Sequence, residues 1–376
     1  MASLKRRFYA ALSPVYRLLF PTRVGRAAFV PRSVRRVLVV RHDRLGDMIL
    51  TTPVFDLLRE LAPGVEVDVL ASTRNAALLE GDARIAHVFM DDGTWTGLWR
   101  LRPHLRARRY DAIFSLIPGR SVRAGWTAGA ASHATTHRVS TWRPKRYHGF
   151  FTRVVRLPES LATAHVSRQM SYVVRAAFGP VGHDTAAASA LAAPIRLHVP
   201  EGARATSAHF LESHGIGAFV TLNLRSAAAA RSWAAAEATA LLPTLLAAHP
   251  ALHVVMVPGP ADAAEAEGVR AQVRSTRVHI FDPAAPLLTL AALVERAAVM
   301  ITPDTMTLHL AVATGRPVLS LHTTTDGNVP DLWKAVGVPS RALLAPEGQG
   351  VPAITATRVA EAFEELAREA QAALGD

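Results

Sequence analysis

The feature that most constrains the fold is an alternation that runs twice along this chain of 376 residues. Short apolar runs, many of them β-branched, alternate with segments of helical length, which is typical of parallel strands joined by helices. The first series of runs covers residues 34–40, 65–71, 86–90 and 110–116, and the second covers 217–224, 252–259, 277–282, 297–304 and 317–322. We therefore predict an α/β protein with two doubly wound, Rossmann-like domains.

A chain of this length also exceeds the size at which one hydrophobic core stops growing. Residues 182–203 are rich in alanine, contain two prolines and carry few groups for chemistry, as expected for a hinge. We predict an N-terminal basic segment, a first domain, a linker, a second domain and a C-terminal helix, at residues 1–33, 34–190, 191–203, 204–354 and 355–376.

Charge is distributed unevenly along the chain, whose formal net charge is +12. Residues 1–46 hold 11 lysines and arginines against one acid, and residues 97–175 hold 15 against two, whereas residues 176–376 hold 13 against 18. This asymmetry predicts a polyanionic partner for the first half. A surface of solvated arginines is the simpler alternative.

The N-terminal residues 3–20 combine basic and aromatic side chains at helical spacing. Such a helix suits a membrane surface, and a packing helix with a solvated arginine face explains the same pattern. No apolar run reaches about 18 residues, the length that spans a bilayer. The absence of cysteine excludes disulfides, iron–sulfur clusters and thiol nucleophiles.

Chemistry is concentrated in the loops that follow three strands. The first loop, "RHDRLGD" at residues 41–47, combines a glycine for a tight turn, two arginines for anionic groups and a carboxylate that could remove a proton from a hydroxyl. Helix capping is the simpler role for Asp47. The residues that we single out in this loop are Arg41, Arg44, Gly46 and Asp47.

The second domain offers an anion site in two such loops. A strand end at Asp304 precedes a helix start with Thr305, and His309 lies one turn further along the same face. Thr305 could instead cap the helix, and His309 could be a core histidine. The loop after residues 217–224 adds groups suited to a diphosphate, namely Arg225, Ser226 and Arg231.

Several familiar motifs are missing. The chain has no GxxxxGK[ST], no GxGxxG after the first strand, no HExxH and no GxSxG, which argues against NTP hydrolysis, dinucleotide chemistry, zinc proteolysis and serine esterase activity. His133 and His137 have ligand-like spacing but no carboxylate cluster nearby, so we predict no metal site.

Three segments together resemble glycosyltransferase family 9, the bacterial ADP-heptose:lipopolysaccharide heptosyltransferases. They are "VLVVRHDRLGDMILTTPVFDLLREL", "LNLRSAAAARSW" and "MITPDTMTLHLAVATGRPVLSLH". The resemblance implies a GT-B fold, with two Rossmann-like domains facing across a cleft. It also implies acceptor binding mainly by the first domain, nucleotide-sugar binding by the second and metal-independent inversion at the anomeric carbon, without a cofactor.

The resemblance also implies roles for individual residues. Asp47 matches the catalytic aspartate, Arg231 the basic residue for the diphosphate, and Asp304, Thr305 and His309 the family's DTGxxH element. Met306 stands where that element has glycine. The larger methionine side chain could crowd the donor phosphates. We therefore predict a donor site of Arg225, Ser226, Arg231, Asp304, Thr305, Met306 and His309, and an acceptor site of Arg41, Arg44, Gly46 and Arg120.

The predicted function is transfer of a heptose or similar sugar from a nucleotide-diphosphate donor, with ADP-heptose first, to a lipopolysaccharide core or related glycolipid. An anionic glycolipid gives the basic first half its partner, and we expect a cytoplasmic protein held peripherally at the inner membrane. One alternative is a non-catalytic relative that binds sugar nucleotides or glycolipids. The alternative of a nucleic-acid binder rests on charge alone. The chain lacks the aromatic stacking motifs of the common RNA-binding modules, so we predict no nucleic-acid partner.

Overall fold

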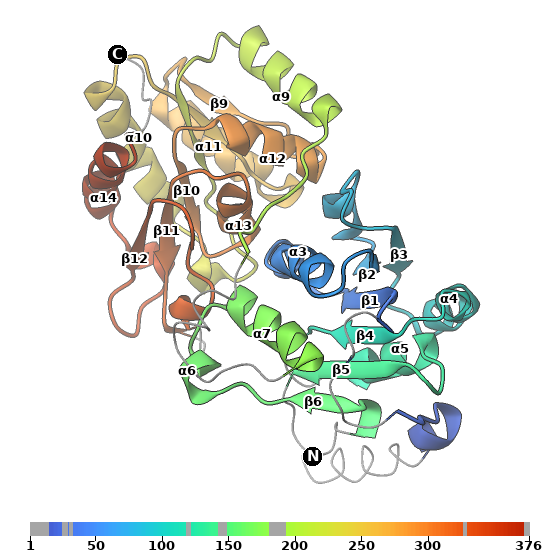
Figure 1. The fold of residues 1–376 in the computed structure, drawn as a ribbon. Coiled ribbons are helices and arrows are strands. Elements are labelled where there is room, and N and C mark those ends of the chain that lie inside the picture. The colour runs from blue at the N-terminus through green and yellow to red at the C-terminus, as the bar shows by residue number, and fades with distance from the viewer. Residues whose placement is uncertain are drawn as a thin grey trace. The chain divides into compact units, whose positions relative to one another are not determined.

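The computed structural model describes residues 15–24, 29, 33–117, 122–141, 149–179, 193–325 and 329–371. The chain forms two compact units, Met1–Ala193 and Pro194–Asp376 (Figure 1). The division falls inside the segment that we interpreted as a linker.

The first unit is built on a six-stranded parallel sheet in the order β3-β2-β1-β4-β5-β6. Apolar residues 37–40 of the central strand are fully buried, as expected when helices cover both faces. The strands are β1 (Arg36–Arg41), β2 (Glu66–Ser72), β3 (His87–Asp91), β4 (Ala112–Ser115), β5 (His137–Thr141) and β6 (Arg153–Val155).

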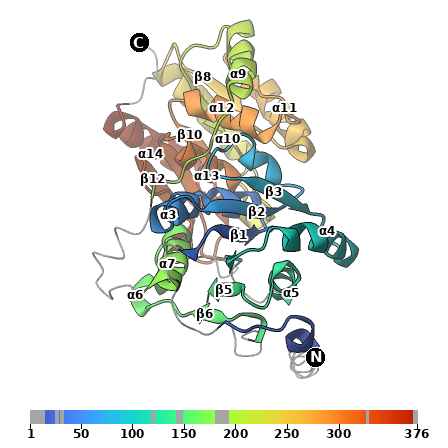
Figure 2. The same ribbon diagram turned by 45° about the vertical axis from the view of Figure 1, so that its right-hand side comes forward.

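Helices cover this sheet on both faces. Helix α3 packs against α7 and helix α4 against α5, and Figures 1 and 2 show the two pairs on opposite faces of the sheet. The helices are α2 (Leu45–Ile49), α3 (Thr52–Leu61), α4 (Trp95–Ala107), α5 (Val122–Ala131), α6 (Glu159–Ala162) and α7 (Val166–Phe178), with the 3₁₀ helix η2 (Ala76–Leu79).

The second unit has another six-stranded parallel sheet, in the order β12-β11-β10-β7-β8-β9. Its central strands β7 and β10 are again buried on both faces. They are β7 (Phe219–Leu222), β8 (His253–Met256), β9 (Val278–Ile280), β10 (Met300–Pro303), β11 (Val318–His322) and β12 (Ser340–Leu344).

Helices α10, α11 and α14 pack together, and α12 packs against α9 and α13. The longer helices are α9 (Glu201–Ser213), α10 (Ala235–Ala248), α11 (Ala263–Val273), α12 (Leu287–Arg296), α13 (Met306–Ala313) and α14 (Ala356–Glu369). The 3₁₀ helices are η4 (Ala229–Arg231), η5 (Pro260–Asp262), η7 (Pro330–Leu332) and η8 (Val351–Ala353).

Both sheets therefore have the doubly wound strand order, and the two predicted Rossmann-like folds are confirmed. In each sheet the order reverses between two neighbouring strands, β1 and β4 in the first and β7 and β10 in the second. Ligands of open α/β sheets bind at this switch point, beyond the carboxyl ends of the strands. The loops that we singled out follow β1, β7 and β10.

The structure adds strands and packing that the sequence did not indicate. Three strands, β5, β6 and β12, were not predicted. At the chain ends, Tyr16 and Phe20 are buried in the first unit, and α14 contributes Phe363 and Leu366 to the core of the second. The ends that we treated as separate segments are thus partly built into the two units; residues 1–14 lie outside the described part.

Candidate active site

Arg41 is the last residue of β1, and its side chain has no exposed surface. Its Nη1 donates to the carbonyl oxygen of Leu116, beyond the end of β4, so the side chain bridges the switch point of the first sheet. Its Nη2 lies 3.0 Å from a carboxylate oxygen of Asp47, and its Nε donates to the Asp47 carbonyl oxygen at 3.2 Å. The buried guanidinium thus fixes both the backbone and the carboxylate of Asp47.

Asp47 lies in the first turn of the short helix α2, whose N-cap residue is Arg44. Its side chain is 9% exposed, and the Thr51 hydroxyl donates to its carbonyl oxygen at 2.7 Å. Asp47 is therefore not the capping residue of α2. It presents a positioned carboxylate whose outer edge is open to solvent.

Asp43 also contacts this arginine, with 3.3 Å between its Oδ1 and the Arg41 Nε. Burial raises the pKa of Asp43 to about 6; the positive charge of Arg41 opposes the rise and the carboxylate of Asp47 adds to it. Two carboxylates thus share one buried cation.

A second charged cluster lies at neighbouring strand ends. Asp91 ends β3, and its carboxylate lies 3.1 Å from Nδ1 of His42 and accepts hydrogen bonds from the guanidinium of Arg123. Burial alone would raise the pKa of Asp91, but the hydrogen bonds from His42 and Arg123 hold it well below its usual range. His42 follows β1, Asp91 ends β3 and Arg123 lies at the start of α5, so only the fold brings them together.

In the second unit, Asn223 joins the two loops at the switch point. Its side-chain amide donates to the hydroxyls of Thr302 (3.2 Å) and Thr307 (3.0 Å) and to the carbonyl oxygen of Arg225 (2.9 Å). Its own carbonyl group accepts from the Arg225 amide. One buried side chain therefore ties the loop after β7 to the loop between β10 and α13.

Ser226 makes a second connection between these loops. Its hydroxyl donates to the carbonyl oxygen of Asp304 at 3.2 Å, and its amide donates to the Ser232 hydroxyl at 3.1 Å. Arg231, the residue before Ser232, ends η4 and is half-buried. Within the described residues its guanidinium has no ion pair or side-chain hydrogen bond, so it remains available to an anion.

Helix α13 begins directly after this connection. Thr305 is its N-cap residue but makes no capping hydrogen bond with its side chain, and Met306 is its first residue and is half-buried. His309 and Asp304 are almost fully buried. The capping role that we considered for Thr305 is thus not what its side chain does, and His309 lies within the packed side of the helix.

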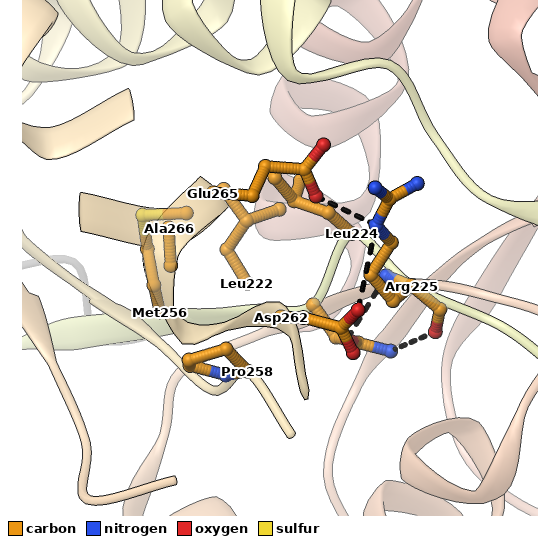
Figure 3. A pocket seen from close by; sticks show the side chains of 9 residues that line it. Leu222, Leu224, Arg225, Met256, Pro258, Asp262, Glu265 and Ala266 are labelled. Atoms are coloured by element: carbon orange, nitrogen blue, oxygen red, sulfur yellow. Dashed lines mark hydrogen bonds and ion pairs between the residues drawn. The ribbon is translucent and has the colours of Figure 1, made fainter. Parts of the chain in front are cut away.

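A small, partly open pocket lies beyond the ends of β7 and β8. Figure 3 shows Arg225 turned toward Glu265, at 2.6 Å, and Asp262, at 3.7 Å. The charge of Arg225 is therefore engaged by two carboxylates. The lining residues are Leu222, Asn223, Leu224, Arg225, Met256, Pro258, Asp262, Glu265 and Ala266.

The predicted acceptor residues are placed differently from one another. Arg44 is exposed and Gly46 is half-buried beside Asp47. Arg41 is wholly buried, so this geometry gives it no direct contact with an acceptor, and we reassign it as a residue that positions Asp47. Arg120 lies outside the described residues. Over the described part of the chain, no group of three or more His, Cys, Asp or Glu residues could hold a metal ion.

Sequence reasoning did not identify Asn223 or the cluster of His42, Asp91 and Arg123. The only available signal was position. Asn223, His42 and Asp91 lie at or just beyond the ends of predicted strands, and Arg123 lies in the helix that follows one. Apart from Arg225, which neighbours Asn223, their hydrogen-bond partners lie far away in the sequence, and no local pattern relates them.

Solved structures with the same architecture are known. A glycosyltransferase family 9 structure from Veillonella parvula has a TM-score of 0.79 at 20% identity, covering 91% of this chain and all of that one. Escherichia coli ADP-heptose lipopolysaccharide heptosyltransferase II has a TM-score of 0.73 at 19% identity, and the match covers 90% of this chain and 100% of that one. The E. coli heptosyltransferase WaaC with ADP has a TM-score of 0.68 at 17% identity, and the match covers 88% of this chain and 99% of that one.

Two six-stranded α/β units of this kind define the GT-B-like class of two-domain glycosyltransferases. The sequence profile of glycosyltransferase family 9 (heptosyltransferase) matches residues 98–350, about two thirds of the chain. The chain belongs to this family, and it is a glycosyltransferase.

Proposed function

We propose that the protein is an inverting, metal-independent glycosyltransferase that moves a heptose or similar sugar from a nucleotide-diphosphate donor to a lipopolysaccharide core or related glycolipid. ADP-heptose is the first candidate donor, because the related E. coli heptosyltransferase WaaC has been solved with ADP and with ADP-2-deoxy-2-fluoro heptose. The observation that carries the proposal is the Asp47 carboxylate, fixed by Arg41 at the switch point of the first sheet.

In this proposal Asp47 is the general base. An acceptor hydroxyl gives its proton to the Asp47 carboxylate while its oxygen attacks the anomeric carbon of the donor. The bond between that carbon and the diphosphate oxygen breaks, and the nucleoside diphosphate leaves with both electrons. Attack opposite the leaving group inverts the configuration. Arg41 acts by orientation, since its guanidinium holds the carboxylate in one position.

The diphosphate needs positive charge when it leaves. The guanidinium of Arg231, in the loop after β7, has no ion pair among the described residues, and helix α13 starts in the loop joined to it through Ser226. Backbone N–H groups at the start of a helix favour anions, and arginine forms paired hydrogen bonds with phosphate oxygens. These groups can stabilise the charge that develops on the diphosphate.

We assign the nucleoside to the loops around the pocket in Figure 3. Pro258 is the half-buried apolar residue of the lining, and Leu222, Met256 and Ala266 form its buried floor. Asp262 and Glu265 could accept hydrogen bonds from ribose hydroxyls, and Arg225 holds both carboxylates in place.

An anionic glycolipid is the proposed acceptor. The first unit is the basic one, and the exposed Arg44 and half-exposed His42 adjoin the Asp47 loop. A lipid-linked acceptor places the enzyme at the cytoplasmic surface of the inner membrane as a peripheral protein. No helix in the described residues is long and apolar enough to cross a bilayer.

Incubation of the purified protein with a panel of nucleotide sugars tests this function. ADP-heptose should raise the melting temperature and transfer its sugar to lipopolysaccharide core in the presence of EDTA, with inverted anomeric configuration. Transfer that stops in EDTA, or a product with retained configuration, would contradict the proposed mechanism.

The same panel tests the alternative of a non-catalytic relative. Met306 stands at the first position of α13, where a glycine would leave more room for phosphate. A protein that binds the donor but yields no product with any acceptor would support that alternative. Met306→Gly is the informative variant, because relief of crowding should tighten nucleotide binding measured by calorimetry.

A further inference from the structure

A short N-terminal segment, residues 15–20, is anchored to the first unit by aromatic side chains. The Tyr16 hydroxyl lies 3.0 Å from the carbonyl oxygens of both Gly125 and Phe150, and its ring is fully buried. The ring of Phe20 packs 4.9 Å from Tyr16 and 5.6 Å from Trp126, measured between ring centroids. These contacts fix one face of the segment and turn the other face outward.

That outer face is apolar. Leu18 is 83% exposed, and Val15 and Leu19 are each 48% exposed. On the neighbouring helix α4, Trp95 and Trp99 are 50% and 45% exposed. We name these five side chains the apolar surface.

The two parts of the apolar surface adjoin each other. The Trp99 ring stacks on Phe20 with 6.4 Å between centroids, and Trp95 lies 6.1 Å from Trp126, which also contacts Phe20. Figures 1 and 2 both show helical residues 15–19 and α4 beside α5 at the same side of the first unit. Single exposed apolar residues are ordinary, but five on adjoining elements, two of them tryptophans, mark an interaction site.

Arginines surround the apolar surface. The guanidinium of Arg102 lies 5.4 Å from the centroid of the Trp99 ring, and that of Arg123 lies 5.4 Å from the Trp95 ring. Arg17 and Arg100 are exposed beside them. Asp91 pairs with Arg123 and Asp92 with Arg100, so Arg17 and Arg102 supply the net positive charge of this face.

We propose that the apolar surface docks the protein on an anionic lipid bilayer. Tryptophan rings settle at the level of the lipid headgroups, leucine enters the acyl boundary, and arginine attracts anionic lipid. The charge around the surface favours a bilayer over a second copy of this chain, because two such basic faces would repel each other. The inference deepens the proposed function, since it names the surface that reaches a lipid-linked acceptor.

Vesicle sedimentation with the full-length protein tests the proposal. Wild type should sediment with vesicles of phosphatidylethanolamine and phosphatidylglycerol, release at high salt and bind far less to phosphatidylcholine alone. Leu18→Glu changes the most exposed side chain, which has no packing role, and should weaken binding at least tenfold. Trp99→Ser should do the same. Leu344→Glu is the matched control, since Leu344 is 47% exposed on β12 in the second unit.

Three results would overturn the proposal. The first is that the wild type does not bind anionic vesicles, and the second is that Leu18→Glu binds them as well as the wild type does. The third is that the wild type binds no vesicles but forms a dimer, which the Leu18→Glu substitution dissociates. Melting temperatures of the variants show whether each is folded.

A second assay separates this proposal from the proposed function. With a lipid-free core oligosaccharide as acceptor, Leu18→Glu should transfer sugar at the wild-type rate although it no longer binds vesicles. If wild type transfers sugar to no acceptor yet binds vesicles through Leu18, the docking surface stands and the proposed function fails. If Leu18→Glu also loses activity on the lipid-free acceptor while remaining folded, the surface serves the reaction itself and membrane docking is the wrong account.

Discussion

The carboxyl of Asp43 makes a pH-dependent contribution to stability whose size follows from the structure. Burial raises its pKa from the usual 3.8 to about 6 in the folded protein. The folded state therefore holds this proton more tightly than the unfolded chain, and its stabilising contribution is complete below about pH 4 and lost as the pH rises through 6. One unit of pKa shift corresponds to about 1.36 kcal/mol, so the shift of about two units makes this loss about 3 kcal/mol.

Asp43→Asn removes this titration. Below about pH 4 both proteins carry an uncharged side chain at position 43, so the variant should gain stability relative to wild type as the pH rises. The gain between pH 4 and pH 7 should approach about 3 kcal/mol in the free energy of unfolding. Urea denaturation at several pH values measures it, with Glu212→Gln, an exposed acid on α9, as the control. A difference that does not change with pH, or that reverses in sign, would refute the reasoning.

Three further variants test other contacts. Arg41→Met leaves Asp43 and Asp47 without their buried cation and should lower the free energy of unfolding by about 3 to 5 kcal/mol in urea, whereas a loss below about 1 kcal/mol would show that the guanidinium is dispensable. Gly350→Ala would bring a Cβ within 2.6 Å of the Ala230 carbonyl oxygen, so η4 must shift and the KM for donor should rise; an unchanged KM would argue against this loop as the donor site. Arg231→Gln should lower kcat about 10² to 10³-fold in steady-state assays, with partial recovery in Arg231→Lys, and equal activity of the three proteins would remove Arg231 from the diphosphate site.

Most of the fold was predictable because the central strands are buried on both faces. Their β-branched runs are visible in the sequence, and all nine predicted strands are present. The missed strands lie toward one edge of each sheet and lack this signal. β5 begins with His137 and Arg138, β6 has three residues, and β12 is at best half-buried. Their pairing depends on neighbours that a single segment does not reveal.

The site was predictable in position but not in detail. Gly46 and Asp47 follow a clear strand, which indicated where the chemistry lies. The sequence could not show that the Arg41 side chain points inward, because the end of a strand gives no indication of which face its last residue takes. The contacts of Asn223 with Thr302 and Thr307, and of Asp91 with His42 and Arg123, depend on strand order in the folded sheet.

The role of Asp47 is tested most directly by comparing Asp47→Asn with Asp43→Asn. The two aspartates share Arg41, so the pair separates the base from a neighbouring carboxylate of similar surroundings. Sugar transfer and donor affinity are measured for both, by product formation and by calorimetry. We predict that Asp47→Asn lowers kcat by about 10² to 10⁴-fold with unchanged donor affinity, and that Asp43→Asn retains most activity. Turnover by Asp47→Asn at the wild-type rate would contradict the account.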